Sequence, residues 1–219
     1  MNPAPTAAAP ADLAGDIARA AGGAGLALPD GAPAQLAAYL DLLARWNRVH
    51  NLTAVRDITD MVSRHLLDSL TGAALLRAGP VLDAGTGAGL PGLPLAIARP
   101  QLRFTLVDVS LKRTQFLQHV VAQLGLAGRV EVIRADVATL PGGTHRTVVA
   151  RALAPLDRLL VQLAHLCTPG VRLLAWRSSL TDAERAAVPA PWRVVDVHAY
   201  RAPEGGAGRM LVEMSQGDA

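Results

Sequence analysis

The chain has 219 residues, of which 51% are hydrophobic and 18% are charged. This composition excludes an intrinsically disordered chain, and the length suffices to bury a core without disulfides or structural metals. The single cysteine, Cys167, excludes an intramolecular disulfide and a multi-cysteine zinc site. The longest uncharged runs, residues 84–98 and 114–128, are shorter than the about 18 apolar residues of a membrane span. Because residues 1–11 also lack a secretory signal, we expect a cytoplasmic protein with no membrane partner.

The basic residues are almost all of one kind. The formal net charge is +3, and each of the 21 basic residues except Lys112 is an arginine. Arginine suits phosphate binding because its guanidinium is a planar fork of donors, but biased codon usage would produce the same excess. The clustering of the arginines, and not their number, must therefore carry any argument for nucleic-acid binding.

The first third of the chain is predicted to be helical. Residues 1–11 are rich in alanine and proline and are predicted to form a disordered tail. A short helix is expected over residues 12–21, and a longer one begins at Ala34, where apolar residues follow helical spacing at Leu36, Tyr39, Leu40, Leu43 and Trp46. A third helix is expected over residues 58–76, with Thr59 as its N-cap, after a polar connector at residues 47–57. We assign residues 12–79 to this helical segment, which we expect to face RNA.

After Pro80 the pattern changes to short apolar runs separated by helical lengths. Strands are predicted at residues 81–84, 104–107, 130–133, 148–150 and 173–176, with a terminal hairpin at 194–197 and 210–214. Helices are predicted at residues 93–98, 112–124 and 156–166. Alternating strands and helices indicate an α/β fold with a mostly parallel sheet that is covered on both faces. We assign residues 80–215 to this domain.

A glycine-rich loop follows the first predicted strand. Its glycines, Gly85, Gly87 and Gly89, are spaced G-x-G-x-G, whereas the dinucleotide fingerprint is G-x-G-x-x-G. Asp83 precedes the loop, and a carboxylate there suits a cationic ligand such as S-adenosylmethionine better than a diphosphate. The alternative is a purely structural tight turn.

Two further carboxylates follow the next two strands. Asp108 lies 23 residues beyond Gly85, close to the offset of about 20 at which an acidic residue binds ribose hydroxyls. Ala135 and Asp136 end the third strand, where they could flank an adenine. Asp108 could instead cap the following helix, and Asp136 could be an ordinary loop residue. Carboxylates at three successive strand ends nevertheless predict a pocket for a nucleoside.

Three stretches of the chain resemble one known family. Residues 46–57 (WNRVHNLTAVRD), 64–70 (RHLLDSL) and 83–94 (DAGTGAGLPGLP) are similar to the RsmG (GidB) family, and the likeness extends from about Leu36 to Trp176. This family methylates N7 of one guanine in 16S ribosomal RNA. The resemblance implies a class I S-adenosylmethionine-dependent methyltransferase fold, whose seven-stranded sheet is mostly parallel with its last strand antiparallel.

The resemblance also implies which residues contact the cofactor S-adenosyl-L-methionine. The family's contacts correspond to Gly85, Leu90, Ala135, Asp136 and Arg151 in this sequence. A surface ion pair is the alternative for Arg151. The chain departs from the family at residues 176–179 (WRSS), where Lys-Gly is expected, and at residues 109–113 (VSLKR), which lack the family's glycine.

The basic residues near these motifs predict an RNA-binding surface. The predicted substrate-binding residues are Arg48, Asn51, Arg56, Arg64, His65, Lys112 and Arg113. Backbone phosphates would supply most of the affinity; the alternative for each arginine is a solvated helix face. We expect 16S ribosomal RNA or the small ribosomal subunit as partner, no metal because His65 and Asp68 alone make a poor site, and a monomer.

Guanine N7 carries no proton, so its methylation needs no general base. We therefore nominate no catalytic residue and expect catalysis through alignment of N7 with the methyl group. Two other functions stay open from the residues alone. A class I methyltransferase acting on a small metabolite would have apolar lid residues where this chain has arginines. A non-catalytic nucleoside- or nicotinamide-binding module would bind NAD and transfer no methyl group.

Overall fold

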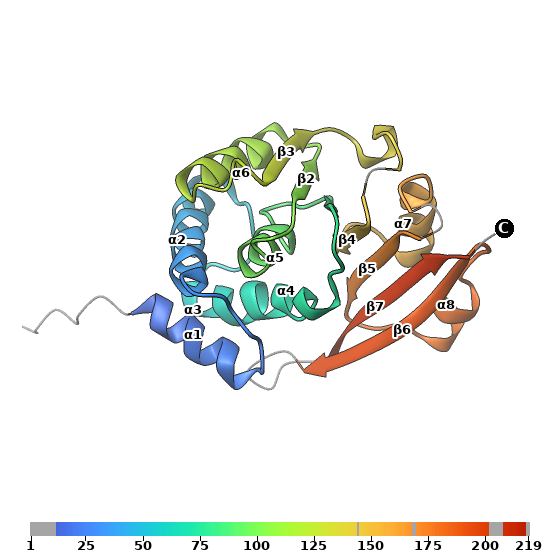
Figure 1. Ribbon diagram of the computed structural model, residues 1–219, viewed down its shortest axis with the longest axis horizontal. Coiled ribbons are helices and arrows are strands. Elements are labelled where there is room, and N and C mark those ends of the chain that lie inside the picture. Colours follow the sequence, from blue (N-terminus) through green and yellow to red (C-terminus); the bar gives the residue numbers. More distant parts are fainter. Residues whose placement is uncertain (1–11, 144, 168–169, 202–207, 218–219) are drawn as a thin grey trace, which may run out of the picture.

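The fold is built on one sheet of seven strands, described in a computed structural model over residues 12–143, 145–167, 170–201 and 208–217. The strand order is β3-β2-β1-β4-β5-β7-β6 (Figure 1). The strands are β1 (Val81–Ala84), β2 (Phe104–Asp108), β3 (Val130–Arg134), β4 (Thr147–Arg151), β5 (Arg172–Arg177), β6 (Trp192–Arg201) and β7 (Gly208–Gln216). Strands β1 to β5 pair in parallel, and β7 pairs antiparallel with both β5 and β6. The predicted mostly parallel sheet with an antiparallel last strand is confirmed.

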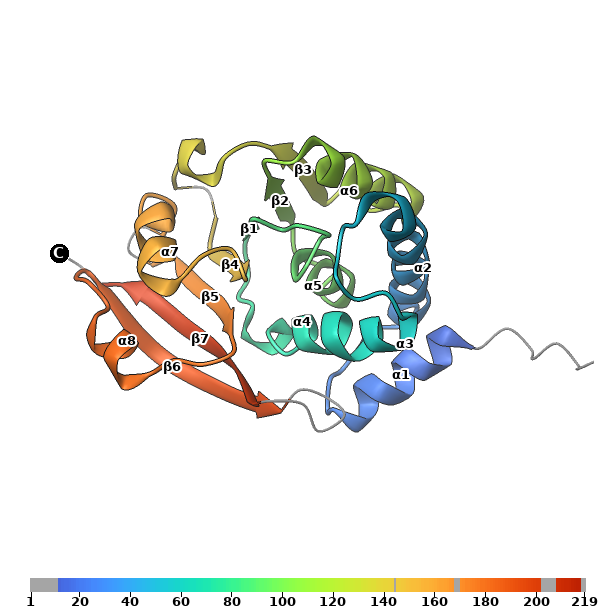
Figure 2. The same cartoon turned by 180° about the vertical axis from the view of Figure 1, so that it is seen from behind.

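Helices cover both faces of the sheet because successive strand residues point to opposite sides. Val81, Leu106, Val149 and Leu174 pack in one core with α2 (Ala32–His50), α5 (Gly92–Ala98) and α6 (Leu111–Gln123). Their neighbours Leu82, Val107, Val148 and Leu173 pack in a second core with α7 (Leu156–Leu163). Figure 2 shows the first group of helices on one side of the molecule and α7 with α8 (Asp182–Ala186) on the other. Consecutive valines and leucines in the strands therefore fill two separate cores.

The N-terminal helices differ in part from the prediction. Helix α1 (Leu13–Gly23) and α2 are present, but the single helix expected at residues 58–76 is divided into α3 (Ile58–Met61), a π-helical turn η1 (Val62–Leu67), α4 (Asp68–Leu70) and a 3₁₀ turn η2 (Ala73–Leu75). The predicted N-cap Thr59 is wrong: Asp57 caps α3, because its carboxylate accepts hydrogen bonds from the backbone N–H of Thr59 (2.7 Å) and of Asp60 (3.3 Å).

The connector between the helices is shorter than predicted. Helix α2 continues to His50, so the non-helical connector runs from residue 51 to 57 and Asn47 lies inside the helix, buried. The side chain of Asn47 holds this connector, since its amide donates to the carbonyl of Val55 (3.1 Å) and its oxygen accepts from the N–H of Thr53 (2.9 Å). Trp46, the last residue of the apolar stripe predicted for α2, is partly buried and packs against Phe116 of α6.

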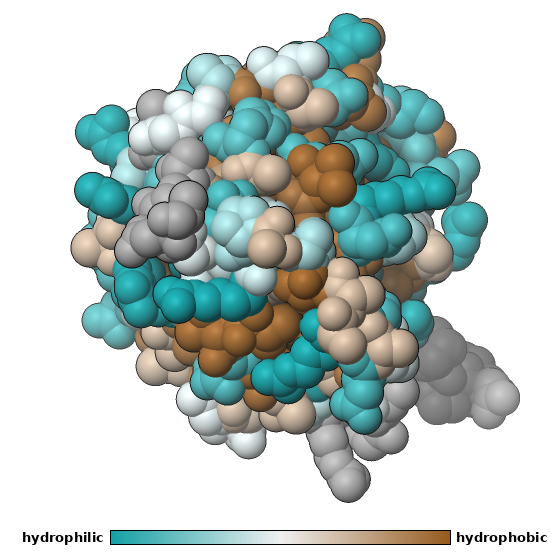
Figure 3. All heavy atoms as spheres, turned by 90° about the vertical axis from the view of Figure 1, so that its right-hand side faces the viewer, coloured by the Kyte–Doolittle hydropathy of each residue, from teal (hydrophilic) through white to brown (hydrophobic). Residues whose placement is uncertain are grey.

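Two smaller features complete the structure. A 3₁₀ turn η3 (Val137–Thr139) follows β3, and α8, absent from the prediction, begins at a capping box between Thr181 and Glu184. No helix in the described ranges has the length and apolarity needed to cross a membrane. The face in Figure 3 carries apolar patches interspersed with hydrophilic side chains. The predicted tail at residues 1–11 lies outside the described residues, and the domain division at residue 80 stays a prediction.

Candidate functional site

The glycine-rich loop lies at the carboxyl end of β1, where it is joined to the end of β2. Gly85, Gly87 and Gly89 all have positive φ, of 68°, 61° and 96°, which is a conformation that favours glycine. The N–H of Gly87 donates to Oδ2 of Asp108 at 3.0 Å, and a Cβ on Gly87 would meet no atom within 4 Å. The predicted loop and the predicted ribose-binding carboxylate therefore meet, and the backbone at Gly87 borders open space.

Asp83 is turned into the protein beneath this loop. Its fully buried carboxylate accepts hydrogen bonds through Oδ2 from the hydroxyl of Thr86 (2.6 Å) and the N–H of Gly92 (2.7 Å). Burial raises the pKa of Asp83 to about 7, although the hydrogen bonds from Thr86 and Gly92 oppose this shift. Oδ1 is buried with no hydrogen-bond partner among the described residues. Asp83 thus shapes the loop, and its action on a bound cation stays a prediction.

A buried tyrosine links the helical segment to the same loop. The hydroxyl of Tyr39 on α2 donates to the carbonyl of Ala88 at 2.9 Å, and burial raises the pKa of this phenol. Tyr39 belongs to the apolar stripe predicted for α2, and the stripe alone gave no sign that its hydroxyl would reach the glycine loop. The position of α2 therefore affects the shape of the loop.

The end of β3 lies beside the end of β2. Asp108 is paired with Arg134, so Ala135 and Asp136 continue past the same edge of the sheet. Asp136 is exposed and its Oδ1 accepts from the N–H of Ala138 at 3.0 Å, which caps η3. Leu90 is buried in the loop. The alternative of Asp108 as the cap of the following helix is wrong, because Ser110 caps α6; Asp108 accepts from the N–H of Ser110 at 2.8 Å, just before the helix.

The strand ends nevertheless fit an adenosine group. A carboxylate has about four acceptor positions, and Asp108 uses one on Oδ1 and two on Oδ2, for Gly87 and Arg113 (3.3 Å). An acceptor position is therefore left for a ribose hydroxyl, and open space at Gly87 adjoins it. The sequence-predicted residues of β1, β2 and β3 come together as one edge, and their direct contact with a cofactor stays a prediction.

Arg151, at the end of β4, forms an ion pair with Asp68, a residue considered above only as a metal ligand. Its Nη1 lies 2.6 Å from Oδ2 of Asp68, whose side chain is only 1% exposed. Oδ1 of Asp68 accepts from the hydroxyl of Tyr200 (2.7 Å) and lies 3.6 Å from Nη1 of Arg209. The backbone carbonyl of Asp68 accepts from Nε1 of Trp176 at 2.8 Å. Arg151 therefore does form an ion pair, but not the surface pair considered as its alternative, because Asp68 is buried and Arg151 is largely buried.

His65 belongs to the same network and is largely buried. Its Nε2 lies 2.8 Å from the hydroxyl of Thr53, and its Nδ1 lies 3.4 Å from Nη2 of Arg151. Burial, and then the charge of Arg151, lowers the pKa of His65 to about 4, so the ring is neutral at pH 7. Because the guanidinium can only donate, Nδ1 is the acceptor and Nε2 carries the proton. The family-like strings at residues 46–57 and 64–70 are thus joined through Thr53 and His65.

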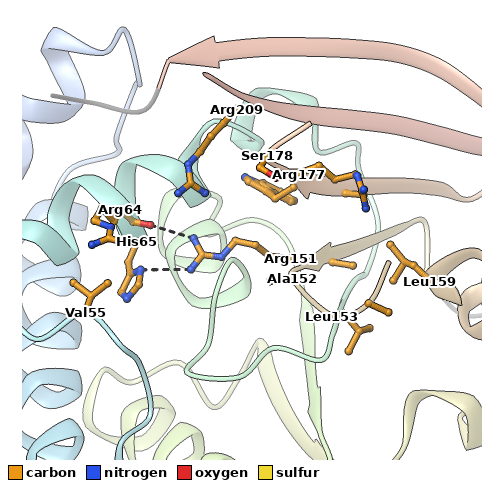
Figure 4. A pocket seen from close by; sticks show the side chains of 14 residues that line it. Val55, Arg64, His65, Arg151, Ala152, Leu153, Leu159, Arg177, Ser178 and Arg209 are labelled. Atoms are coloured by element: carbon orange, nitrogen blue, oxygen red, sulfur yellow. Dashed lines mark hydrogen bonds between the residues drawn. The ribbon is translucent and has the colours of Figure 1, made fainter. Parts of the chain in front are cut away.

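A cavity of about 360 Å³ lies beside this network, at the ends of β4 and β5. Figure 4 shows that Arg64 and His65 from η1, Arg151 from β4 and Arg209 from β7 surround it. The cavity adjoins the glycine loop through Leu153, since a Cβ on Gly85 would lie 2.3 Å from Cδ1 of this leucine. Arg177 and Ser178, within the segment that departs from the family pattern, also line the cavity.

The predicted RNA-binding residues lie in three places. Arg48, Asn51 and Arg56 are exposed at the end of α2 and in the connector, where Nη2 of Arg56 donates to Oδ1 of Asn51 at 3.4 Å. Lys112 joins this group, because its Nζ donates to the carbonyl of His50 at 3.5 Å. The remaining residues are Arg64 and His65, which line the cavity, and Arg113, which contacts Asp108. Their contact with RNA stays a prediction.

Within the described residues, no three His, Cys, Asp or Glu side chains are placed to hold a metal ion. His65 and Asp68 are both engaged in the network around Arg151. The expectation that the protein uses no metal stays a prediction.

Solved structures with the same fold include several methyltransferases. The structure of magnesium protoporphyrin IX methyltransferase from Synechocystis with bound SAM has a TM-score of 0.60 at 18% identity, covering 80% of this chain and 91% of that one. The tRNA methyltransferase TrmK of B. subtilis has a TM-score of 0.58 at 14% identity, covering 69% of this chain and 66% of that one. The predicted class I methyltransferase fold is confirmed.

Sequence comparison identifies much closer relatives. A protein of Xanthomonas campestris pv. campestris (strain B100), named ribosomal RNA small subunit methyltransferase G, is 45% identical over 180 residues, which cover 82% of this chain and 84% of that protein. A protein of the same name from Alkalilimnicola ehrlichii is 44% identical over 186 residues, with 84% of each chain covered. The sequence profile of GidB, rRNA small subunit methyltransferase G, matches residues 32–212. The chain therefore belongs to the GidB family.

Proposed function

We propose that the protein transfers a methyl group from S-adenosyl-L-methionine to N7 of a specific guanine in 16S ribosomal RNA. The observation that carries this proposal is the family relationship, which extends over residues 32–212 and thus includes the glycine loop, the ends of β1 to β5 and the helical segment from α2 onward. The relatives' printed name supports small-subunit ribosomal RNA as the substrate class. The finer assignment, to guanine N7, rests on the resemblance of the three motif strings.

The residues proposed to hold the cofactor lie along one edge of the sheet. They are Asp83, Gly85, Gly87, Gly89, Leu90, Asp108, Ala135, Asp136 and Arg151. The bound cofactor supplies a methyl group on a positively charged sulfur. Asp108 would accept from the ribose, and Gly87, which borders open space, would give the ligand access to the loop backbone. The ionised Asp83 carboxylate would add a negative charge beneath the loop.

The chain's own contribution to the reaction is alignment. Guanine N7 presents a lone pair without a proton, so no side chain must remove one. His65 agrees with this, because its lowered pKa of about 4 makes it a weak base and both ring nitrogens are engaged by Thr53 and Arg151. The cavity beside Leu153 gives a nucleobase a place next to the glycine loop. Holding N7 in line with the methyl group accounts for catalysis by proximity.

The family relationship favours this function over a methyltransferase for a small metabolite. The residues around the cavity agree, since its walls include Arg64, Arg177 and Arg209, whereas an apolar metabolite would need an apolar lid. We further propose that the protein acts as a monomer, without a metal, and in the cytoplasm, where its proposed substrate is found.

The proposed function is tested with small subunits from a strain that lacks the gene. The purified protein and labelled S-adenosylmethionine are incubated with these subunits and, in parallel, with their naked RNA. The RNA is then digested and analysed by mass spectrometry. We expect N7-methylguanine at one position in at least one of the two substrates. Digests without this nucleoside would refute the proposal, and a methyl group elsewhere on guanine would refute the N7 assignment alone.

A further inference from the structure

The cavity at the ends of β4 and β5 carries more positive charge than the protein neutralises. Four arginines line it: Arg64, Arg151, Arg177 and Arg209. Asp68 serves both Arg151 (2.6 Å) and Arg209 (3.6 Å), and Glu184 pairs with Arg177 at 2.6 Å. The side chain of Arg64 is exposed and has no hydrogen-bond or ion-pair partner among the described residues. Two carboxylates thus face four guanidinium groups, which leaves two positive charges for a ligand.

Apart from the arginines, His65 and Ser178, the cavity is lined by apolar residues. Its floor includes Ala150, Leu153, Ala175 and Trp176, and His65 beside them is neutral at pH 7 because its pKa is about 4. The volume of about 360 Å³ lies within the range of about 300–1,000 Å³ that is usual for small-ligand sites. A flat, uncharged ring system with two anionic groups on its rim matches this combination of floor and charge.

We propose that this cavity holds the extruded target nucleotide of the RNA, and that Arg64 and Arg209 bind the phosphodiester groups on its two sides. This inference rests on the proposed function. A guanine within an RNA helix would have to be extruded, because the major groove, where N7 lies, is too deep and narrow for side chains to enter. Enzymes that modify a base move it out of the helix into a pocket. In Figure 4, Arg209 reaches the cavity from β7 and Arg64 from η1.

The chemistry of N7 methylation favours phosphates over the base as ligands of these arginines. Arginine most often binds guanine through O6 and N7 together, and such a contact would occupy the lone pair that must attack the methyl group. The methylated base also carries a positive charge, which unpaired guanidinium groups would repel. Phosphates on both sides of the nucleotide neutralise Arg64 and Arg209 before that charge develops.

Binding of a nucleotide without methyl transfer tests the proposal directly. The probe is guanosine 3′,5′-bisphosphate, which carries a phosphate on each side of one nucleoside, and guanosine is the reference ligand. Binding is measured by ligand-detected NMR, which measures millimolar dissociation constants. We expect the bisphosphate to bind roughly 100-fold more tightly than guanosine, or about tenfold for each charged contact. Arg64→Gln and Arg209→Gln should each remove about tenfold of that difference and leave guanosine binding unchanged.

The matched control is Arg103→Gln. Arg103 is exposed and directly precedes β2, so it lies at the amino ends of the strands, opposite the cavity. Its substitution removes the same charge from the protein. It should alter neither dissociation constant. Equal binding of the two ligands to the unmodified protein, or an equal loss in Arg103→Gln, would overturn the proposal. Should Arg209→Gln fail to fold, Arg64→Gln still decides the matter, because that side chain is exposed.

A second measurement uses the RNA substrate. Arg64→Gln should raise KM for RNA about tenfold and reduce the slope of log affinity against log salt by about 0.7–0.9, the value for one phosphate contact. Affinity for S-adenosylmethionine should stay unchanged in calorimetry. If RNA methylation fails while bisphosphate binding depends on the two arginines, the proposed function falls and the nucleotide site stands. If methylation succeeds and both variants bind bisphosphate normally, the site assignment falls.

Discussion

Asp68→Ala tests whether the buried ion pair holds the helical segment against the sheet. The carboxylate of Asp68 is 1% exposed, and it contacts Arg151 at 2.6 Å and the hydroxyl of Tyr200 at 2.7 Å. The substitution leaves the guanidinium of Arg151, which is 17% exposed, without its carboxylate. Removing one partner of a buried pair costs about 3–5 kcal/mol, because the remaining charge stays desolvated. We expect a loss of that size in the free energy of unfolding.

Urea denaturation at pH 7 measures this loss, with Asp16→Ala as the control. Asp16 forms an ion pair with Arg19 on α1, and both side chains are largely exposed, so its removal should cost less than about 1 kcal/mol. The slope of unfolding free energy against urea should stay the same in both variants, since the surface exposed on unfolding does not change.

A double-mutant cycle with Arg151→Ala separates the pair from the rest of the network. Arg151→Ala alone should cost less than Asp68→Ala, because Asp68 keeps Tyr200 and Arg209 as partners. The coupling energy between the two substitutions should exceed about 1 kcal/mol, as for residues in direct contact. A cost of Asp68→Ala no greater than that of Asp16→Ala would show that the network contributes nothing to stability.

Three further variants test the loop. Asp108→Ala should weaken S-adenosylmethionine binding by about 1.5–3 kcal/mol, the value of a charged hydrogen bond, and unchanged affinity in calorimetry would exclude the ribose contact. The pKa of Asp83 is raised to about 7, so its contribution to stability is present at low pH and lost as pH rises. The unmodified protein should therefore lose about 2 kcal/mol of unfolding free energy between pH 5 and pH 7, and Asp83→Asn should not show this loss. A constant difference between the two proteins in urea denaturation at both pH values would contradict this. Tyr39→Phe leaves the carbonyl of Ala88 without its donor and should cost about 1–3 kcal/mol of stability, together with a loss of cofactor affinity that a purely structural role for the hydroxyl would not produce.

The sheet could be predicted because its signals are local. Strands β1 to β5 are short runs of valine and leucine between helical lengths, and each lies within one or two residues of its predicted position. The loop after β1 was predicted for the same reason, since three glycines and the preceding carboxylate are adjacent in sequence. The divided helix at residues 58–70 was not predicted, because a π-helical turn and an α-helix share similar apolar spacing.

The network at the cavity could not be predicted because its partners are distant in sequence. Asp68 lies 83 residues from Arg151 and 132 residues from Tyr200. Local patterning assigns Asp68 to a helix face and Arg151 to a strand end, and it gives no indication that the two residues are in contact. The family resemblance of residues 64–70 indicated that this region is important. Only the fold shows why, since it places a buried carboxylate of this segment against an arginine of β4.

The strand order means that the last strand to be synthesised, β7, is inserted between two strands that are made before it. Because β7 lies between β5 and β6, the ribosome releases β6 before β7, the strand with which it pairs. Until residues 208–216 emerge, the nascent protein therefore leaves one edge of β5 and both edges of β6 without a partner strand. Unpaired strand edges can pair with strands of other chains. A protein truncated just before residue 208 should therefore aggregate and show no partial activity.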